Sequence, residues 1–189
     1  MSLFEPQLPP GLLYVPDWLR QLEHDAALRE VDSLPFDESL SRRVQHYGAK
    51  YDYSFAKVDE RGTAPEIPPC LRKIGERLLH EGFFEAEPDQ VIVNEYLEDQ
   101  GIAAHIDRLT FGEAVATVSL LEMWPMEFVS PDGEKLEVLL GVRSLAVMQG
   151  ESRKKWTHAI PKRKMDVVGG LKQKRVRRVS LTFRTLPID

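Results

Sequence analysis

Short apolar stretches separated by turn residues run through the second half of the chain, a pattern typical of an antiparallel sheet. Beyond residue 91 these stretches cover residues 114–121, 126–129, 136–140, 145–148 and 177–185. Between two of them, Ser130-Pro131-Asp132-Gly133 predicts a hairpin turn, because these residue types favour turn geometry. So many short strands in succession predict a jelly roll.

Two helices are predicted before these strands. Apolar residues recur near the helical period after Pro16, at Trp18, Leu19, Leu22, Ala26 and Val31. A second periodic set, Leu71, Ile74, Leu78 and Leu79, stops before Gly82, a residue type that commonly ends a helix. The expected fold class is therefore mainly β with flanking helices, an α+β arrangement.

Polar residues gather on one face of two predicted strands, because side chains at positions i and i+2 of a strand point the same way. Near the C-terminus, one face carries Arg178, Ser180, Thr182 and Arg184, opposite Val179, Leu181 and Phe183. A planar guanidinium pairs with a carboxylate through two parallel hydrogen bonds, so this face suits a dicarboxylate ligand. Taken alone, it also fits a half-buried strand whose arginines meet solvent. In the stretch 91–97, Asn94 and Tyr96 share a face in the same way.

Three residues match the ligand types of a mononuclear iron site. His105 and Asp107 are spaced to share one face of an extended strand, and His158 follows later in the chain. Two imidazoles and one carboxylate can occupy one face of an octahedral Fe(II) and leave the opposite face open for an organic ligand and dioxygen. A His-x-Asp pair alone is a common chance occurrence, and a lone histidine is ordinarily structural. Combined with the arginine-bearing strand, the three residues predict oxidative chemistry.

The order of these motifs resembles the AlkB family of Fe(II)- and 2-oxoglutarate-dependent dioxygenases, over roughly residues 42–186. The motifs stand in the order Asn94-x-Tyr96, His105-x-Asp107, His158 and Arg178-x-Ser180-x-x-x-Arg184. The resemblance implies a double-stranded β-helix, or jelly roll, with helices against one sheet. It also implies that His105, Asp107 and His158 bind Fe(II) and form the catalytic centre, with dioxygen as a co-substrate.

The same resemblance assigns residues to 2-oxoglutarate. Arg178 and Tyr96 would hold its distal carboxylate. Asn94, Ser180 and Arg184 would surround its chelating end, although the family often carries asparagine at the position of Ser180.

Two stretches, 101–107 and 150–158, resemble most closely the branch that hydroxylates modified wobble uridines in tRNA. Members that demethylate 1-methyladenine and 3-methylcytosine typically carry an acid two positions after the aspartate ligand, where this chain has Leu109. We therefore expect a dioxygenase that oxidises a modified nucleic-acid base, in RNA and specifically tRNA, by hydroxylation or oxidative demethylation. Three alternatives stay open: an alkylated-DNA repair demethylase, an oxygenase acting on a protein or small molecule, and a non-catalytic relic.

Two segments are candidates for substrate contact. Between positions 153 and 178 the chain holds eleven Lys and Arg against one acid, and there Lys172, Lys174 and Arg175 would contact phosphates; a solvated loop is the alternative. Earlier, the segment 42–53 mixes cations with aromatic residues, as in a lid that stacks a base. The candidates in that segment are Arg42, Arg43, Tyr47 and Lys50. An amphipathic hairpin with its aromatic residues in the core is the alternative.

Composition is that of one globular domain, 1–189, in which 1–90 supplies helical support and the lid and 91–186 the catalytic jelly roll. The 42% hydrophobic and 29% charged content, with a net charge of −5, is ordinary for a soluble protein. The chain has no apolar run that would span a bilayer and no signal-peptide pattern. One cysteine, Cys70, suits a reducing compartment. We expect a monomer in the cytoplasm, or in the nucleus of a eukaryote, without membrane contact.

Overall fold

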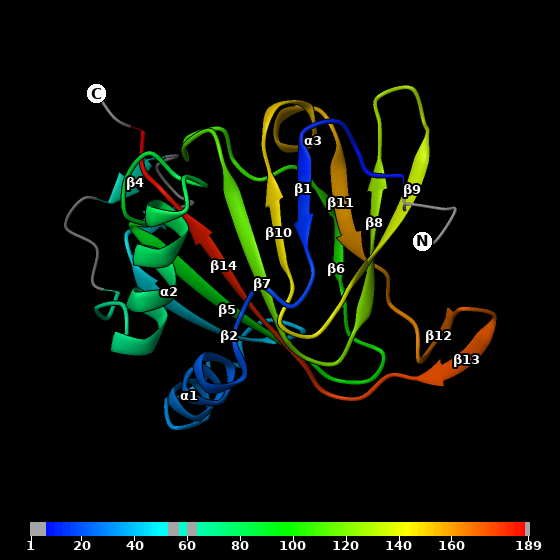
Figure 1. The fold of residues 1–189 in the computed structure, drawn as a ribbon, viewed down its shortest axis with the longest axis horizontal. Helices are drawn as coiled ribbons and strands as arrows, with labels where there is room; N and C mark the ends of the chain where they lie inside the picture. Colours follow the sequence, from blue (N-terminus) through cyan, green and yellow to red (C-terminus); the bar gives the residue numbers. More distant parts are fainter. Residues whose placement is uncertain (1–6, 53–56, 60–63, 188–189) are drawn as a thin grey trace.

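The computed structural model of the chain describes residues 7–52, 57–59 and 64–187. Two antiparallel sheets face each other, and two of the helices lie beside the larger sheet (Figure 1). The helices are α1 (Gln21–Asp32), α2 (Pro69–His80) and α3 (Gly150–Lys154). The strands are β1 (Leu12–Val15), β2 (Arg43–Gly48), β3 (Lys50–Asp52), β4 (Lys57–Asp59), β5 (Gln90–Tyr96), β6 (Ile102–His105), β7 (Val115–Leu121), β8 (Trp124–Val129), β9 (Lys135–Leu140), β10 (Leu145–Met148), β11 (Thr157–Ile160), β12 (Met165–Val168), β13 (Leu171–Lys174) and β14 (Arg178–Arg184).

The larger sheet has six strands in the order β1-β10-β7-β14-β5-β2, and the smaller has four in the order β6-β11-β8-β9. Strands distant in sequence therefore lie side by side, as in a jelly roll, and the predicted fold class is confirmed. The central strand β14 pairs with β5 on one side and β7 on the other. Strands β1 and β2, which precede residue 90, form the two edges of the six-stranded sheet.

Strand alternation divides the apolar residues between two cores. On β14, Val179, Leu181 and Phe183 face the cluster built with α1 and α2. A second cluster lies between the sheets and includes Trp124, Phe128 and Trp156. The polar residues on the other face of β14 therefore point into the space between the sheets, not toward solvent. This excludes the half-buried strand with solvent-facing arginines.

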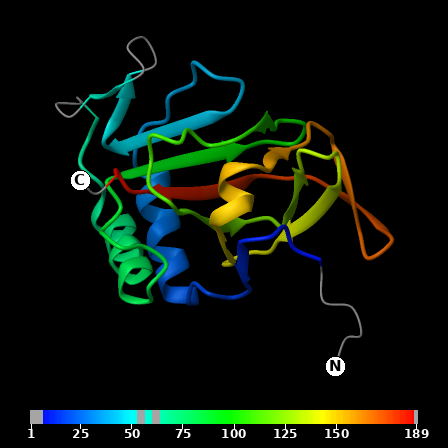
Figure 2. The same ribbon diagram turned by 90° about the horizontal axis from the view of Figure 1, so that it is seen from above.

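The turn at residues 130–133 joins β8 to β9, as predicted, with Gly133 at φ 87° and its amide donating to the Ser130 carbonyl at 3.1 Å. The solvated loop that was the alternative for the basic segment is instead, at Gly169 and Gly170, the turn of the β12–β13 hairpin, and both glycines have positive φ. This hairpin projects from the body of the molecule in both views (Figures 1 and 2).

The first predicted helix is present, but its buried face is different from the expected one. Helix α1 begins at Gln21, so Trp18 and Leu19 are buried in the segment before it. Leu22 is 83% exposed, and the buried helical positions are His24, Ala27 and Val31. The apolar spacing combines Trp18 and Leu19, which lie before the helix, with residues inside it, so it does not identify the buried face of the helix. Helix α2 buries Leu71, Ile74 and Leu78 as predicted.

Candidate active site

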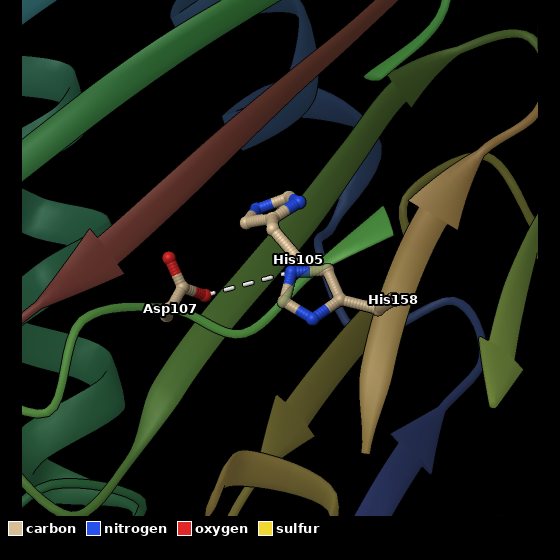
Figure 3. Close-up of side chains that lie close together, drawn as sticks. All are labelled: His105, Asp107 and His158. Atoms are coloured by element: carbon tan, nitrogen blue, oxygen red, sulfur yellow. Dashed lines mark ion pairs between the residues drawn. The ribbon is translucent and has the colours of Figure 1, made fainter. Parts of the chain in front are cut away.

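The two histidines of the predicted iron site are cross-strand neighbours. His105 ends β6 and is the register partner of His158 on β11, so both imidazoles emerge at the same level of the smaller sheet. Their ring centroids lie 4.3 Å apart. Figure 3 shows both rings beside the carboxylate of Asp107.

Asp107 reaches this site from outside regular structure. The extended strand assumed for the His-x-Asp spacing stops at His105, and Asp107 lies in the irregular segment that follows. Its carboxylate nevertheless lies with the histidines: one potential ligand atom from each of the three residues falls within 4.8 Å of the others. Asp107 Oδ2 is 3.6 Å from His158 Nε2, and Oδ1 accepts a hydrogen bond from Arg184. These are two nitrogens and one oxygen of the kinds that Fe(II) accepts.

The protonation states suit metal binding. The Nδ1 of His105 lies 2.8 Å from the carbonyl of Ala103, which can only accept, so Nδ1 donates this hydrogen bond and Nε2 is the ring nitrogen left to bind a metal. Burial lowers the pKa of His158 to about 4, so this ring is neutral at pH 7. Burial alone would raise the pKa of Asp107, but Arg184 above all holds it below its usual value. His158 and Asp107 are thus in their metal-binding forms, and the hydrogen bond of His105 leaves Nε2 as its ligand atom.

A wall of polar side chains on the larger sheet faces this triad. Register places Ser180 opposite Asn94 on β5 and opposite Ser119 on β7, and it pairs Arg178 with Tyr96. All five of these side chains are buried. The structure thus brings together the five residues predicted for 2-oxoglutarate, since Arg184 lies on the same face of β14 as Arg178.

Arg178 is the most unusual member of this wall. It is 1% exposed, and among the described residues it has no carboxylate within ion-pair distance. Its Nη2 donates to Ser119 Oγ at 3.1 Å, its guanidinium lies 5.6 Å from the ring centre of Tyr96, and its Nε has no hydrogen-bond partner in the described part of the chain. Burial lowers its pKa to about 10, so it remains a cation at pH 7. A buried cation without a counter-charge is costly, which fits a site for an anionic ligand.

Two other predicted residues have partners within the protein. Arg184 donates to Asp107 and, through Nη1, to Gln90 Oε1 at 2.8 Å. Asn94 Oδ1 accepts from Arg42 Nε at 2.8 Å. Arg184 therefore already contributes its charge to the carboxylate of the triad, whereas Arg178 does not.

A cavity of about 860 Å³ connects the triad, the polar wall and strand β2. Val44 and His46 on β2 line it, as does Arg42 immediately before that strand. Asp37, in the segment before β2, also lines the cavity. Leu109 does not line it and is 67% exposed.

Two predicted substrate residues of this segment face the other way. Arg43 points to the helix side of the sheet, where it forms an ion pair with the fully buried Glu95. Tyr47 borders the cavity, but its side chain belongs to the core with the helices, and its hydroxyl donates to Gln45 Oε1 at 3.1 Å. Strand alternation thus turns both side chains toward the helix side of the sheet, although Tyr47 still borders the cavity. The side chain of Lys50 lies outside the described residues.

Several cations of the basic segment 153–178 are paired with acids of the protein. Arg175 is 2% exposed, pairs with both carboxylate oxygens of Asp166, and lies 4.2 Å from the ring centre of Trp124. It is therefore not available to a phosphate, and that prediction is wrong. Lys172 and Lys174 are exposed on β13, and Lys174 lies 3.2 Å from Glu98.

Sequence reasoning missed two members of the wall. Gln90 shares a face of β5 with Asn94 and Tyr96, so the same alternation would have found it had the strand been started one residue earlier. Ser119 lay in a stretch that was interpreted as apolar, and only the pairing of β7 with β14 places it beside Arg178.

Comparison with known proteins agrees with this geometry. The sequence profile of the 2OG-Fe(II) oxygenase superfamily matches residues 11–184. The chain belongs to this superfamily. This oxygenase chain therefore belongs to a class that uses Fe(II), 2-oxoglutarate and dioxygen, and the three predicted co-reactants are confirmed at that level.

Its relatives carry AlkB names, as the resemblance predicted. The chain is 37% identical to tRNA (carboxymethyluridine(34)-5-O)-methyltransferase ALKBH8 of Mus musculus, over 94% of this chain and 30% of that protein. It is 32% identical to the alkylated DNA repair protein ALKBH8 homolog of Arabidopsis thaliana, over 97% of this chain and 61% of that protein. The oxygenase thus spans about a third of the mouse relative. Its fold is similar to OsALKBH1, with a TM-score of 0.72, 18% identity, and coverage of 95% of this chain and 100% of that one.

Among the described residues, no helix has the length and apolar character to cross a membrane.

Proposed function

We propose that this chain is a catalytic domain that uses Fe(II) and 2-oxoglutarate to oxidise a modified uridine in RNA, with tRNA as the leading substrate. The observation that carries the proposal is a single cavity that contains both the His105, Asp107 and His158 triad and the uncompensated cation Arg178.

The residues fit both groups that the family uses. His105, Asp107 and His158 would hold Fe(II), because their donor types and protonation states suit it. Arg178 would pair with the distal carboxylate of 2-oxoglutarate, because that ligand supplies the missing counter-charge. Asn94, Tyr96, Ser180 and Arg184 would surround the remainder of the co-substrate.

When bound, Fe(II) with 2-oxoglutarate and dioxygen supplies the oxidation of a substrate carbon, with succinate, carbon dioxide and a hydroxylated product as the outcome. Arg178 orients the co-substrate. The side chains around it are buried, which keeps bulk water away from the bound co-substrate. A hydroxyl on a side-chain carbon remains in the product, whereas a hydroxymethyl on nitrogen is lost as formaldehyde. The fate of the product therefore depends on the substrate and not on the triad.

The substrate side of the cavity favours an acceptor-rich base. Arg42 lines it and offers donors that suit the carbonyl oxygens of uracil or an anionic substituent on that base. Relatives whose names refer to tRNA carboxymethyluridine support the same substrate class. The exposed Leu109 supplies no acid for a cationic base.

The β12–β13 hairpin offers a surface for the RNA backbone. Lys172 and Lys174 lie opposite Val167 and Met165 in the register, so these four exposed residues share one face of the ribbon. The ion pair of Arg175 with Asp166 anchors the base of the hairpin. We assign the phosphate contacts to the two lysines and not to Arg175.

The free thiol of Cys70 is compatible with work in a reducing compartment such as the cytoplasm, and we propose that the domain acts there as a monomer.

Mass spectrometry of nucleosides tests this function directly. Transfer RNA from cells that lack the protein is incubated with the protein, Fe(II) and 2-oxoglutarate, in competition with a 1-methyladenine oligonucleotide. We expect an added oxygen on a modified uridine. If the protein binds metal and 2-oxoglutarate but oxidises neither the tRNA nor the oligonucleotide, the proposed substrate is contradicted. The proposed use of Fe(II) and 2-oxoglutarate is not.

A second candidate, demethylation of a cationic base, is favoured by Asp37. This acid lines the cavity, and the backbone amide of Ser39 donates to its Oδ1 at 2.8 Å, which holds its pKa below the usual value. A carboxylate there can accept from a cationic methylated base. Loss of 1-methyladenine repair in Asp37→Asn, with uridine oxidation unchanged, would support this second activity.

A further inference from the structure

Arg153, in the short helix α3, carries a buried guanidinium next to the triad. It is 2% exposed, and no described carboxylate lies within ion-pair distance of it. Its Nη1 donates to the main-chain carbonyl of Asp107 at 2.7 Å, and its Nη2 donates to that of Arg108 at 2.6 Å. Its Nε has no partner among the described residues. Burying a cation against two carbonyls, without a carboxylate partner, is energetically costly. A purely structural role for the two hydrogen bonds therefore does not account for an arginine at this position.

The two carbonyls belong to a segment outside regular structure, where the Arg108 carbonyl also accepts a hydrogen bond from the Phe111 amide at 3.3 Å. Strand β6 ends at His105, and residues 106–108 form neither strand nor helix. The direction of the Asp107 carboxylate therefore depends on contacts with other parts of the chain. Arg184 contacts the carboxylate itself, and Arg153 holds two successive main-chain carbonyls, those of Asp107 and Arg108.

Arg153 also links Asp107 to His158. Helix α3 leads directly into β11, which carries His158 opposite His105. The amide of Ser152 in the same helix donates to the carbonyl of Pro10 at 2.8 Å, which ties α3 to the segment before β1. One short stretch of chain thus places one proposed ligand and fastens the main chain of another.

We propose that Arg153 is a positioning residue of the metal centre, which fixes the Asp107 main chain so that its carboxylate faces His105 and His158 before metal binds. This inference rests on the proposed metal role of Asp107. It explains why the stretch 150–158 is distinctive in the sequence beyond its histidine. Partners of metal ligands that lie outside the coordination sphere typically change metal affinity by about 10- to 100-fold.

Binding of Mn(II) to the metal-free protein tests the proposal without relying on turnover. Free Mn(II) is followed by electron paramagnetic resonance as the protein is titrated. Arg153→Gln loses the double donation, so we expect Mn(II) affinity to fall by about 10-fold or more. Arg153→Lys keeps the charge but not the planar fork, so we expect a smaller loss. Thermal unfolding of each variant measures the fold separately.

Two control variants distinguish positioning from general destabilisation. Arg175→Gln removes an equally buried arginine that donates to Asp166 and to the carbonyl of Pro161, so it reports the cost of losing a buried arginine whose hydrogen bonds do not go to Asp107. Lys154→Met changes the same helix at an exposed position. We expect both controls to bind Mn(II) as the wild type does, even where the melting temperature falls.

Wild-type Mn(II) affinity in folded Arg153→Lys and Arg153→Gln would overturn the positioning role. A loss of affinity in Arg175→Gln equal to that in Arg153→Gln would also overturn it, since the effect would then follow stability. Failure of the wild-type protein to bind Mn(II) would instead contradict the proposed metal site, so the two failures are distinguishable.

Discussion

Arg178 and Arg184 lie on the same face of β14, yet only Arg184 has a carboxylate partner among the described residues. Arg184 donates to Asp107, which keeps that carboxylate ionised and oriented. Arg178 is buried, and it contacts the hydroxyl of Ser119 and the ring of Tyr96. Two arginines of one strand thus have different tasks, because one charge is used within the protein and the other is available to a ligand.

The first prediction concerns Arg178. Arg178→Lys retains the charge but loses the planar fork, and Arg178→Ala loses both, so the affinity for 2-oxoglutarate should fall in that order. A charged hydrogen-bonded pair contributes about 1.5–3 kcal/mol, which corresponds to about 10- to 100-fold in affinity for the alanine variant. Calorimetric titration with 2-oxoglutarate in the presence of Mn(II) measures it.

Arg177→Lys is the matched control, because Arg177 is the neighbouring residue and pairs with Glu95 and Asp32 on the opposite face of the sheet. Its affinity for 2-oxoglutarate should equal that of the wild type. An unchanged titration in both Arg178 variants would remove Arg178 from the site.

The second prediction concerns the triad. His105→Ala, Asp107→Ala and His158→Ala each remove one of three protein ligands from an open site, so each should abolish succinate production from 2-oxoglutarate. Chelation of metal from the wild-type protein should have the same effect, reversed by added Fe(II). His24→Ala serves as the control histidine, since His24 lies on α1 among residues of the helix layer. Retained turnover in all three triad variants would show that the metal is bound elsewhere.

The third prediction concerns pH and the stability of the metal-free protein. Burial lowers the pKa of His158 from 6.5 to about 4 in the folded state. The unfolded chain therefore takes up this proton first as the pH falls, so the free energy of unfolding should decrease between pH 6.5 and about 4. One proton gives a slope of up to about 1.4 kcal/mol per pH unit.

Urea unfolding at several pH values, with a chelator present, measures this slope. His158→Gln has no titrating ring at that position, so its slope in the same window should be smaller by the contribution of one proton. Equal slopes in the two proteins would mean that the folded state does not depress the pKa of His158.

The fourth prediction concerns RNA. Lys172→Glu combined with Lys174→Glu should weaken tRNA binding and reduce the salt dependence of binding by about one to two units of slope. Turnover of 2-oxoglutarate without RNA should not change, since neither lysine lines the cavity. Filter binding at two salt concentrations makes the measurement, and Lys73→Glu on the exposed side of α2 is the control. If the double variant binds tRNA with wild-type affinity, the RNA binds at another surface of the protein.

Much of the candidate site was predictable because the signals that carry it are local. Alternation along β14 and β5 depends only on strand geometry, so Arg178, Ser180, Arg184, Asn94 and Tyr96 could be placed on shared faces from the chain alone. The chain order of the motifs, together with the family resemblance, then pointed to the iron ligands.

The incorrect predictions for Arg43 and Arg175 share one physical cause. Arg43 and Arg175 are cations in basic stretches of sequence, yet each is neutralised by a buried acid, Glu95 or Asp166. Glu95 lies on β5, which pairs with β2 only after the sheet forms. The charge of a segment does not show which of its cations remain available, because their partners are chosen by strand pairing.

The sequence by itself determined the residue types, their faces on each strand and the chemistry they can support, because those follow from composition and from the two-residue repeat of a strand. Only the tertiary structure decided which charges remain uncompensated and how Asp107 is held. Asp107 lies past the end of β6, where no local repeat sets its direction, and Arg184 and Arg153 reach it from β14 and α3. Contacts between segments so distant in the chain depend on packing of the whole fold.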